Sequence, residues 1–200
     1  MRMKRDILGV ALCGGESRRM GEDKAKLIVR PGLTQLEYAL ELLGRVCWRT
    51  AAGAGRVDRC EIEGVKVILD AEGVTGPMAG VVAALRLASG WPVLVVACDM
   101  PYLEMSHLLL LLNRRDRAKQ ATAFLAADGR PDPMCALYET SCLPLVESAI
   151  SDGSYSLRRI LERANLERVE LPRPELLASV NDRQDLLKAR RAKLKGSSAG

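Results

Sequence analysis

Two runs of consecutive apolar residues constrain the fold of this 200-residue chain most strongly: "ILGVAL" at 7–12 and "PVLVVA" at 92–97. Neither run alternates between apolar and polar residues, so each predicts a strand that is buried on both faces. The first run leads into a cysteine and two glycines, and the second into Cys98 and Asp99. Strands of this kind are typical of a parallel sheet that helices cover on both sides.

The segments around these runs alternate between strand and helix patterns. Residues 34–46 show helical spacing, and Thr34 with Glu37 three residues later matches a capping box. Further strands are predicted at 65–69, 121–126 and 167–171, and further helices at 78–89, 103–115, 140–151, 155–164 and 182–194. This alternation predicts one Rossmann-like, three-layer α/β/α domain with a mostly parallel sheet over residues 1–195. Residues 196–200, "GSSAG", are expected to form a disordered tail.

Composition argues against several classes of protein. Aromatic residues make up 4% of the chain, too few for the stacking platforms of single-stranded nucleic-acid binding. The apolar run 7–13 is short and follows an aspartate, unlike a signal peptide, and no run is long enough to span a membrane. We therefore expect a cytoplasmic protein with neither nucleic acid nor membrane as a partner.

The net charge of +5 comes from residues 188–195, "KARRAKLK", since the rest of the chain is neutral. A charge run of this kind is interpreted as a solvated helix end, with a contact to an anionic partner as the alternative. Six scattered cysteines form no C-x-x-C pair, and His107 is the only histidine, so we expect reduced thiols and no zinc site. His107 lies in an apolar helical pattern and is expected to have a structural role.

The stretch "LCGGESRRMGEDK" at 12–24 follows the first predicted strand. It matches neither the Walker A spacing nor G-x-G-x-x-G. Gly14 and Gly15 allow the backbone to approach a ligand closely, and successive N–H groups can bind an anion. Ser17 adds a hydroxyl, and Arg19 and Lys24 add positive charge. The stretch therefore predicts phosphate binding, and an exposed loop with solvated charges is the alternative.

Aspartates follow two further predicted strands at the edge where this loop also lies. Asp70 ends one strand and Asp99 another. Mg²⁺ that accompanies a nucleoside triphosphate takes one or two carboxylates plus phosphate oxygens, which makes these side chains candidates. Each could instead be an ordinary turn or cap residue. Gly76 and Gly80 open the next helix, where they either face an anion or allow close packing on the sheet.

These motifs resemble the signature of the molybdenum cofactor guanylyltransferases, the MobA-type nucleotidyltransferases. The similarity runs in order through nearly the whole chain: "LCGGESRRMGEDK" (12–24), Asp70, "GPMAG" (76–80), "CDMP" (98–101), "RPDPMCALY" (130–138), "GSYSLRRIL" (153–161) and "VNDRQDL" (180–186). The resemblance implies a fold of the nucleotide-diphospho-sugar transferase type. It also implies transfer of GMP from GTP to the terminal phosphate of molybdopterin, with release of pyrophosphate.

The resemblance also implies roles for individual residues. Four residues, Leu12, Cys13, Gly14 and Gly15, would line guanine and ribose, and Ser17 belongs to the same nucleotide-binding stretch. Arg19 and Lys24 would hold the triphosphate and act in catalysis, and Asp70 would contact the nucleoside. Asp99 would bind Mg²⁺. Gly76, Gly80 and Asn181 would lie on the side of the molybdopterin acceptor, and proteins of molybdoenzyme maturation would be further partners.

The chain departs from the family pattern at three places. Cys13 replaces an alanine, residues 49–56 lack an expected asparagine near the base, and Ser179 stands where another asparagine is usual. The double glycine favours GTP, whereas the related cytidylyltransferases usually carry Ala-Gly. Two alternatives remain open: transfer from CTP, or to another acceptor phosphate, and a non-catalytic carrier of nucleotide or molybdopterin.

Overall fold

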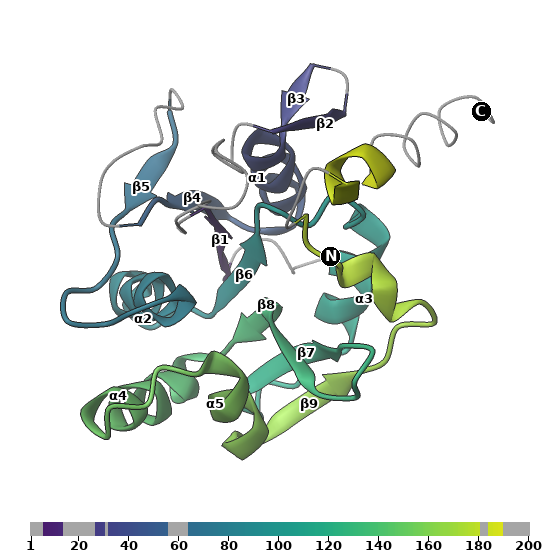
Figure 1. The fold of residues 1–200 in the computed structure, drawn as a ribbon. Coiled ribbons are helices and arrows are strands. Elements are labelled where there is room, and N and C mark those ends of the chain that lie inside the picture. The colour runs from purple at the N-terminus through teal and green to yellow at the C-terminus, as the bar shows by residue number, and fades with distance from the viewer. Residues whose placement is uncertain (1–5, 14–26, 31, 56–63, 181–183, 190–200) are drawn as a thin grey trace.

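The computed structural model describes residues 6–13, 27–30, 32–55, 64–180 and 184–189 (Figure 1). Its centre is a seven-stranded sheet in the order β5-β4-β1-β6-β8-β7-β9. The strands are β1 (Leu8–Leu12), β4 (Arg49–Gly53), β5 (Lys66–Ile68), β6 (Val93–Ala97), β7 (Ala121–Leu125), β8 (Pro131–Tyr138) and β9 (Leu166–Val169). A separate two-stranded sheet pairs β2 (Ile28–Arg30) with β3 (Leu33–Thr34).

The sheet is mostly parallel, as predicted, with one reversed strand. β1 pairs in parallel with both β4 and β6, β4 with β5, and β7 with β9. β8 alone in this sheet runs antiparallel to its neighbours β6 and β7. Because β8 is reversed, its first residues lie at the edge where β1, β4, β5 and β6 end.

Helices cover both faces of the sheet and make three layers (Figure 1). They are α1 (Gln35–Val46), α2 (Pro77–Ala88), α3 (Met105–Asn113), α4 (Leu143–Ser151) and α5 (Leu157–Arg163), with short 3₁₀ turns at Thr140–Cys142 and Pro174–Leu177. α1 and α3 share one buried apolar cluster with Leu94 and Val96 of β6. α2, α4 and α5 share a second cluster with Val93 and Val95. Successive residues of β6 thus face opposite layers, which explains its uninterrupted apolar sequence.

The predicted capping box is present at the start of α1. The Thr34 hydroxyl accepts the N–H of Glu37 at 3.2 Å, and the Glu37 carboxylate accepts the N–H of Thr34 at 2.7 Å. The far end of α1 packs tightly on β1: a Cβ added to Gly9 would lie 2.9 Å from Sγ of Cys47. The glycine in β1 therefore allows the helix to lie close to the sheet.

Two strands of the sheet are missing from the sequence prediction. β4, "RTAAG", consists largely of alanine and glycine and carries a weak strand signal. β8, "PDPMCALY", contains two prolines, which usually argue against an internal strand. The other predicted strands and helices are present, and residues 184–189 of the predicted 182–194 helix are helical. The predicted boundary between a 1–195 domain and a tail falls outside the described residues.

Several smaller expectations are also met in the described part of the chain. Cys47, Cys135 and Cys142 are buried thiols without disulfide bonds, and burial raises the pKa of Cys47 and Cys142 to about 12. Nδ1 of His107 accepts the N–H of Glu104 at 3.0 Å at the start of α3, which is a structural role. Within the described residues, no helix has both the length and the apolar character needed to cross a bilayer.

Candidate active site

The carboxyl ends of the four parallel strands β5, β4, β1 and β6 meet at one edge of the sheet. The hydrogen-bond ladder continues one residue past these ends: the N–H of Cys13 donates to Gly53 O at 2.8 Å, and the N–H of Cys98 to Leu12 O at 2.9 Å. Ala54 N–H donates in the same way to Ile68 O at 3.1 Å. The chain that follows each strand therefore starts from a fixed position, and in sheets of this type ligands bind beyond this edge.

Asp70 lies at this edge in contact with the first turn of α2. Its N–H donates to Gly55 O at 2.9 Å, and the next residue, Ala71, donates to Ala79 O at 3.1 Å. A Cβ placed on Gly80 would lie 3.3 Å from Oδ1 of Asp70 and 2.9 Å from Cδ2 of Leu12. The small residue at 80 thus lets α2 approach both side chains. Although the resemblance implies an acceptor role for Gly80, the structure places it against two residues predicted to bind the nucleotide.

Gly76 precedes α2 in a backbone conformation that glycine alone adopts readily, with φ 66° and ψ −162°. Pro77 follows at the first helical position, where its fixed φ suits a helix start. These two residues set the direction in which α2 leaves the edge of the sheet. The requirement for glycine at 76 is therefore conformational, and a Cβ there would meet no atom within 4 Å.

Asp99 lies two residues beyond the end of β6, on the other side of β1 from β5 and Asp70. Its main-chain oxygen accepts the N–H of Val180 at 2.9 Å. This bond joins the C-terminal motif "VND" to the strand end that carries Asp99. Asn181, which the resemblance places on the acceptor side, directly follows Val180 in the chain and lies outside the described residues.

A small apolar cluster connects this region to the chain that follows the glycine-rich stretch. It consists of Leu27, Val29, Val180, Leu186 and Ala189. Cys13 and Leu27 flank residues 14–26: Cys13 lies beside β4 at the carboxyl edge, and Leu27 packs in the cluster with Val180. The tertiary structure thus brings both described ends of the glycine-rich stretch to the edge that carries Asp99.

Six of the predicted site residues lie outside the described part of the chain: Gly14, Gly15, Ser17, Arg19, Lys24 and Asn181. The described ones, Leu12, Cys13, Asp70, Gly76, Gly80 and Asp99, all lie at or next to the carboxyl edge. Cys13, which replaces the family's alanine, turns its thiol toward the sheet, where Sγ donates to Gly53 O at 3.0 Å. The substitution is therefore accommodated within the strand ladder.

Sequence reasoning missed a further carboxylate at this edge, Asp132. It is the second residue of the reversed strand β8 and is only 9% exposed. Burial raises the pKa of Asp132, and the negative charge of Asp99 raises it further. The N–H of Met134 donates to Oδ1 of Asp132 at 2.7 Å and opposes this rise. An acid between two prolines, "PDP", is the sequence signal that could have drawn attention to this position.

The donor set at this edge suits a magnesium ion bound together with phosphates. Asp99 and Asp132 are carboxylates near enough to influence each other, and carboxylate oxygens are the protein ligands that Mg²⁺ prefers. In the described ranges no group of three or more metal-ligating side chains occurs. Mg²⁺ needs no such group, because phosphate and water oxygens complete its coordination. The residues therefore fit a cation that arrives with a nucleotide.

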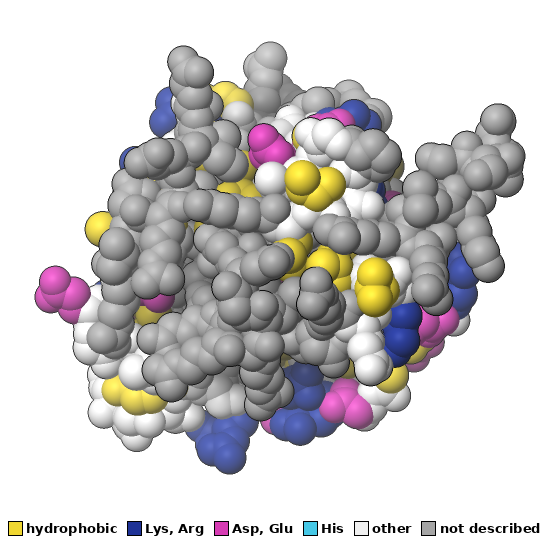
Figure 2. Space-filling view, turned by 45° about the horizontal axis from the view of Figure 1, so that its top comes forward, with side chains coloured by type: hydrophobic (Ala, Val, Ile, Leu, Met, Phe, Trp, Pro, Cys, Tyr) yellow, Lys and Arg dark blue, Asp and Glu magenta, His cyan; other side chains and the backbone are white. Residues whose placement is uncertain are grey.

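Figure 2 shows how the described side chains are distributed on one face of the molecule. The yellow side chains that this view exposes form small separate groups, and the charged side chains lie mainly around the rim. Among the described residues of this face, scattered apolar side chains of this kind are normal for an exposed protein surface.

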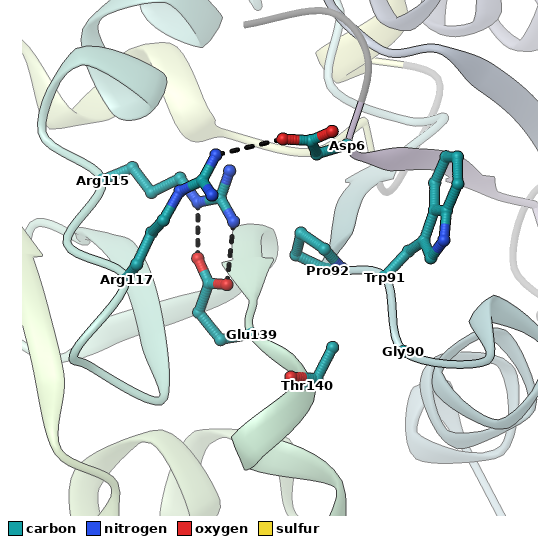
Figure 3. Close-up of a pocket in the computed structure, with 8 residues that line it drawn as sticks. All are labelled: Asp6, Gly90, Trp91, Pro92, Arg115, Arg117, Glu139 and Thr140. Carbon is teal, nitrogen blue, oxygen red and sulfur yellow. Dashed lines mark hydrogen bonds and ion pairs between the residues drawn. The ribbon is translucent and has the colours of Figure 1, made fainter.

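A pocket of about 360 Å³ lies at the opposite edge of the sheet, near the amino ends of β1 and β6 (Figure 3). Its charged residues are already paired: Arg115 donates two hydrogen bonds to Glu139, at 2.6 and 2.9 Å, and Arg117 contacts Asp6 at 3.2 Å. The side chains of Arg115 and Glu139 are largely buried. This pocket is far along the strands from the predicted site residues, and its ion pairs indicate a structural role.

Comparison with known proteins identifies the family of this chain. Residues 9–169 match the sequence model of the MobA-like NTP transferase domain. The chain belongs to this family. A probable molybdenum cofactor guanylyltransferase of Mycobacterium avium is 30% identical over 90% of this chain and 93% of that protein. The family assignment makes this chain a nucleotidyltransferase.

Two further relatives of this MobA-like domain are informative. A molybdenum cofactor biosynthesis bifunctional protein of Synechocystis is 29% identical over 90% of this chain, which spans only 52% of that longer protein. The crystal structure of molybdopterin-guanine dinucleotide biosynthesis protein A of Archaeoglobus fulgidus superposes with a TM-score of 0.76 and 25% identity. The superposition covers 94% of this chain and 99% of that one, so the predicted nucleotidyltransferase fold is confirmed.

Proposed function

We propose that this MobA-like domain transfers GMP from GTP to the terminal phosphate of molybdopterin and releases pyrophosphate. The observation that carries the proposal is the arrangement at the carboxyl edge. Leu12 and Cys13 lead into the glycine-rich stretch, Asp70 lies on one side of them, and Asp99 lies on the other. Relatives named as molybdenum cofactor guanylyltransferases, aligned over nearly their whole length, support the choice of substrates.

In the proposed reaction the protein mainly positions the reacting phosphates and neutralises their charge. An acceptor phosphate with a second pKa of about 6 is already ionised near neutral pH, so its oxygen can attack the α-phosphorus without a general base. Arg19 and Lys24 hold the triphosphate and stabilise the negative charge that grows on the departing pyrophosphate. Asp70 orients the nucleoside, and its carboxylate lies beside Gly80 in the first turn of α2.

Asp99 is the proposed ligand of the divalent cation. Mg²⁺ bound there supplies Lewis-acid stabilisation of the phosphate oxygens. The main-chain bond from Val180 to Asp99 also supports the proposed acceptor role of Asn181. It joins the segment that leads to Asn181 to the residue proposed to bind the cation. In this proposal the residue that would hold the cation is also tied to the acceptor side of the site.

The decisive experiment supplies molybdopterin with each of the four nucleoside triphosphates, radiolabelled at the α-phosphate, and detects dinucleotide and pyrophosphate. We expect Mg²⁺-dependent product with GTP. Product with CTP instead would assign the chain to the cytidylyl branch. Nucleotide binding without pyrophosphate release would identify a non-catalytic carrier and refute the proposal.

A variant tests the role of Asp99 in the same assay. Asp99→Asn keeps the size of the side chain and the main-chain bond to Val180 but removes the ligand charge. We expect product formation to fall by about 100-fold or more, as for loss of electrostatic stabilisation at a phosphoryl group. Near-normal turnover with a correctly folded Asp99→Asn protein would exclude this residue from the reaction.

A further inference from the structure

The main-chain oxygen of Leu103 accepts hydrogen bonds from two side chains that belong to different elements. The Tyr38 hydroxyl, from α1, donates to it at 3.0 Å. Nη2 of Arg30, from the end of β2, donates to the same oxygen at the longer distance of 3.5 Å. The guanidinium carbon of Arg30 also lies 3.3 Å from the centre of the Tyr38 ring, which makes a cation–π contact. We call these three residues, Arg30, Tyr38 and Leu103, the Leu103 junction.

The Leu103 junction connects two segments that carry predicted site residues. Arg30 is the last residue of β2, which begins directly after Leu27, the buried residue at the far end of the glycine-rich stretch. Leu103 closes the turn that follows Asp99, and its N–H donates to Met100 O at 3.3 Å. The junction therefore joins the chain that leaves the glycine-rich stretch to the chain that leaves Asp99.

Arg30 is an unfavourable residue for stability alone. Its side chain is partly buried, and burial lowers the pKa of Arg30. Nη1 is buried and finds no hydrogen-bond partner among the described residues. A buried polar group without a partner costs free energy, and an apolar side chain of similar length would avoid that cost. A residue that is locally unfavourable is expected where function requires it.

We propose that Arg30 and Tyr38 are positioning residues, which act through the main chain at Leu103 to hold Asp99 and the glycine-rich stretch in a fixed relation for nucleotidyl transfer. The inference rests on the proposed function, because it takes these two segments as the sites of the cation and the phosphates. Transfer of this kind depends mainly on positioning, and a misplacement of about 1 Å can lower the rate by about 100-fold. Neither side chain has to touch a substrate for this effect.

A purely structural role for the junction makes different predictions. If the junction only held the β2–β3 hairpin against α1, its loss would lower stability, and activity would fall only as far as the protein unfolds. Arg30→Met keeps a side chain of similar length but removes the donor, the charge and the unpartnered nitrogen. We expect this variant to fold, so a loss of activity well below its unfolding temperature would report positioning.

The test measures kcat and KM for GTP in the dinucleotide assay, together with thermal unfolding. Arg30→Met removes the guanidinium, Arg30→Lys keeps a cation near the ring, and Tyr38→Phe removes only the hydroxyl. The double variant Arg30→Met/Tyr38→Phe is measured as well. The control is Arg49→Met. The guanidinium carbon of Arg49 likewise lies over an aromatic ring, 4.5 Å from the centre of Trp48, but at the amino end of β4, away from the site.

We expect Arg30→Met to lower kcat by about 10-fold or more and to change KM for GTP by less than about threefold. Arg30→Lys should retain more activity than Arg30→Met, and Tyr38→Phe should also lower kcat. The double variant should lose less than the product of the two single losses, because both side chains act on one carbonyl. The control should turn over normally, and every variant should unfold near the temperature of the unmodified protein.

Normal kcat in a folded Arg30→Met protein would overturn the inference while leaving the proposed function in place. Equal losses in Arg30→Met and Arg30→Lys, with lower unfolding temperatures, would also overturn it and assign a structural role. If Arg30→Met did not fold, normal kcat in Tyr38→Phe and Arg30→Lys would overturn it in the same way. Absence of dinucleotide product from the unmodified protein would instead contradict the proposed function itself, and the inference with it.

Discussion

Replacement of Gly80 by alanine tests how the first turn of α2 positions the nucleotide site. The added Cβ would lie 2.9 Å from Cδ2 of Leu12 and 3.3 Å from Oδ1 of Asp70. Carbon atoms pack best at about 3.5–4.0 Å, so the leucine contact needs a shift of roughly 0.6–1 Å. Leu12 is itself buried, at 8% exposed, and has little room to move.

Two opposing effects set the stability of Gly80→Ala. Alanine in a helix interior is favoured over glycine by about 0.8–1.0 kcal/mol. Overpacking of a filled core costs about 1–3 kcal/mol. We therefore expect the free energy of unfolding to fall by about 0–2 kcal/mol. Gly44→Ala in α1 is the matched control, because a Cβ there meets nothing within 4 Å, and it should gain about 1 kcal/mol.

Gly80→Ala should weaken GTP binding more than it lowers the stability of the protein. A hydrogen bond to a charged group contributes about 1.5–3 kcal/mol, so displacement of the Asp70 carboxylate should weaken GTP binding by about tenfold or more. Denaturant unfolding measures the stability, and calorimetric titration with GTP measures the affinity. If Gly80→Ala gained as much stability as Gly44→Ala and bound GTP normally, the packing argument for α2 would be refuted.

The remaining predictions concern the starts of two helices. Gly76→Ala should destabilise the protein by about 1–3 kcal/mol in urea unfolding through backbone strain alone, since a Cβ there meets nothing within 4 Å; a change as small as that of an ordinary surface substitution would contradict this. Thr34→Ala should cost about 1 kcal/mol by removing the α1 cap. The Thr34 N–H and hydroxyl lower the pKa of Glu37, so the part of this stabilisation that comes from the hydroxyl–carboxylate bond is present at neutral pH and is lost as the pH falls through the folded-state pKa of Glu37. The difference in stability between the two proteins should therefore narrow in acid without vanishing, because the bond from the Glu37 N–H to the Thr34 hydroxyl does not titrate; a constant difference at every pH would count against the hydroxyl–carboxylate bond.

The post-strand positions were predictable because local sequence alone marks where a strand ends. "ILGVAL" and "PVLVVA" predicted buried strands. Asp70 and Asp99 were identified as candidates from their positions after strands, and Cys13 from the family resemblance. The structure confirms that these three residues lie at one edge. The roles of Arg19 and Lys24 stay predictions, since both lie outside the described residues.

β4 and β8 were missed for physical reasons. The alanines and glycine of β4 have low strand propensity, and their burial between β1 and β5 comes from neighbours distant in the sequence. The prolines of β8 argue against an internal strand, yet Pro131 is its first residue and pairs with Leu125 where the register shifts. Because β8 was missed, Asp132 was missed as well.

The local sequence was enough to predict the alternation of buried strands and amphipathic helices, and the polar residues that follow the strands. These features depend on side-chain periodicity over a few residues, which local sequence specifies. It took the tertiary structure to show that β8 runs antiparallel beside β6, that Asp132 at the start of β8 reaches the carboxyl edge, and that Gly80 lies close to Leu12 and Asp70. Strand order and helix docking join residues far apart in the chain, so they are chosen by the packing of the whole core.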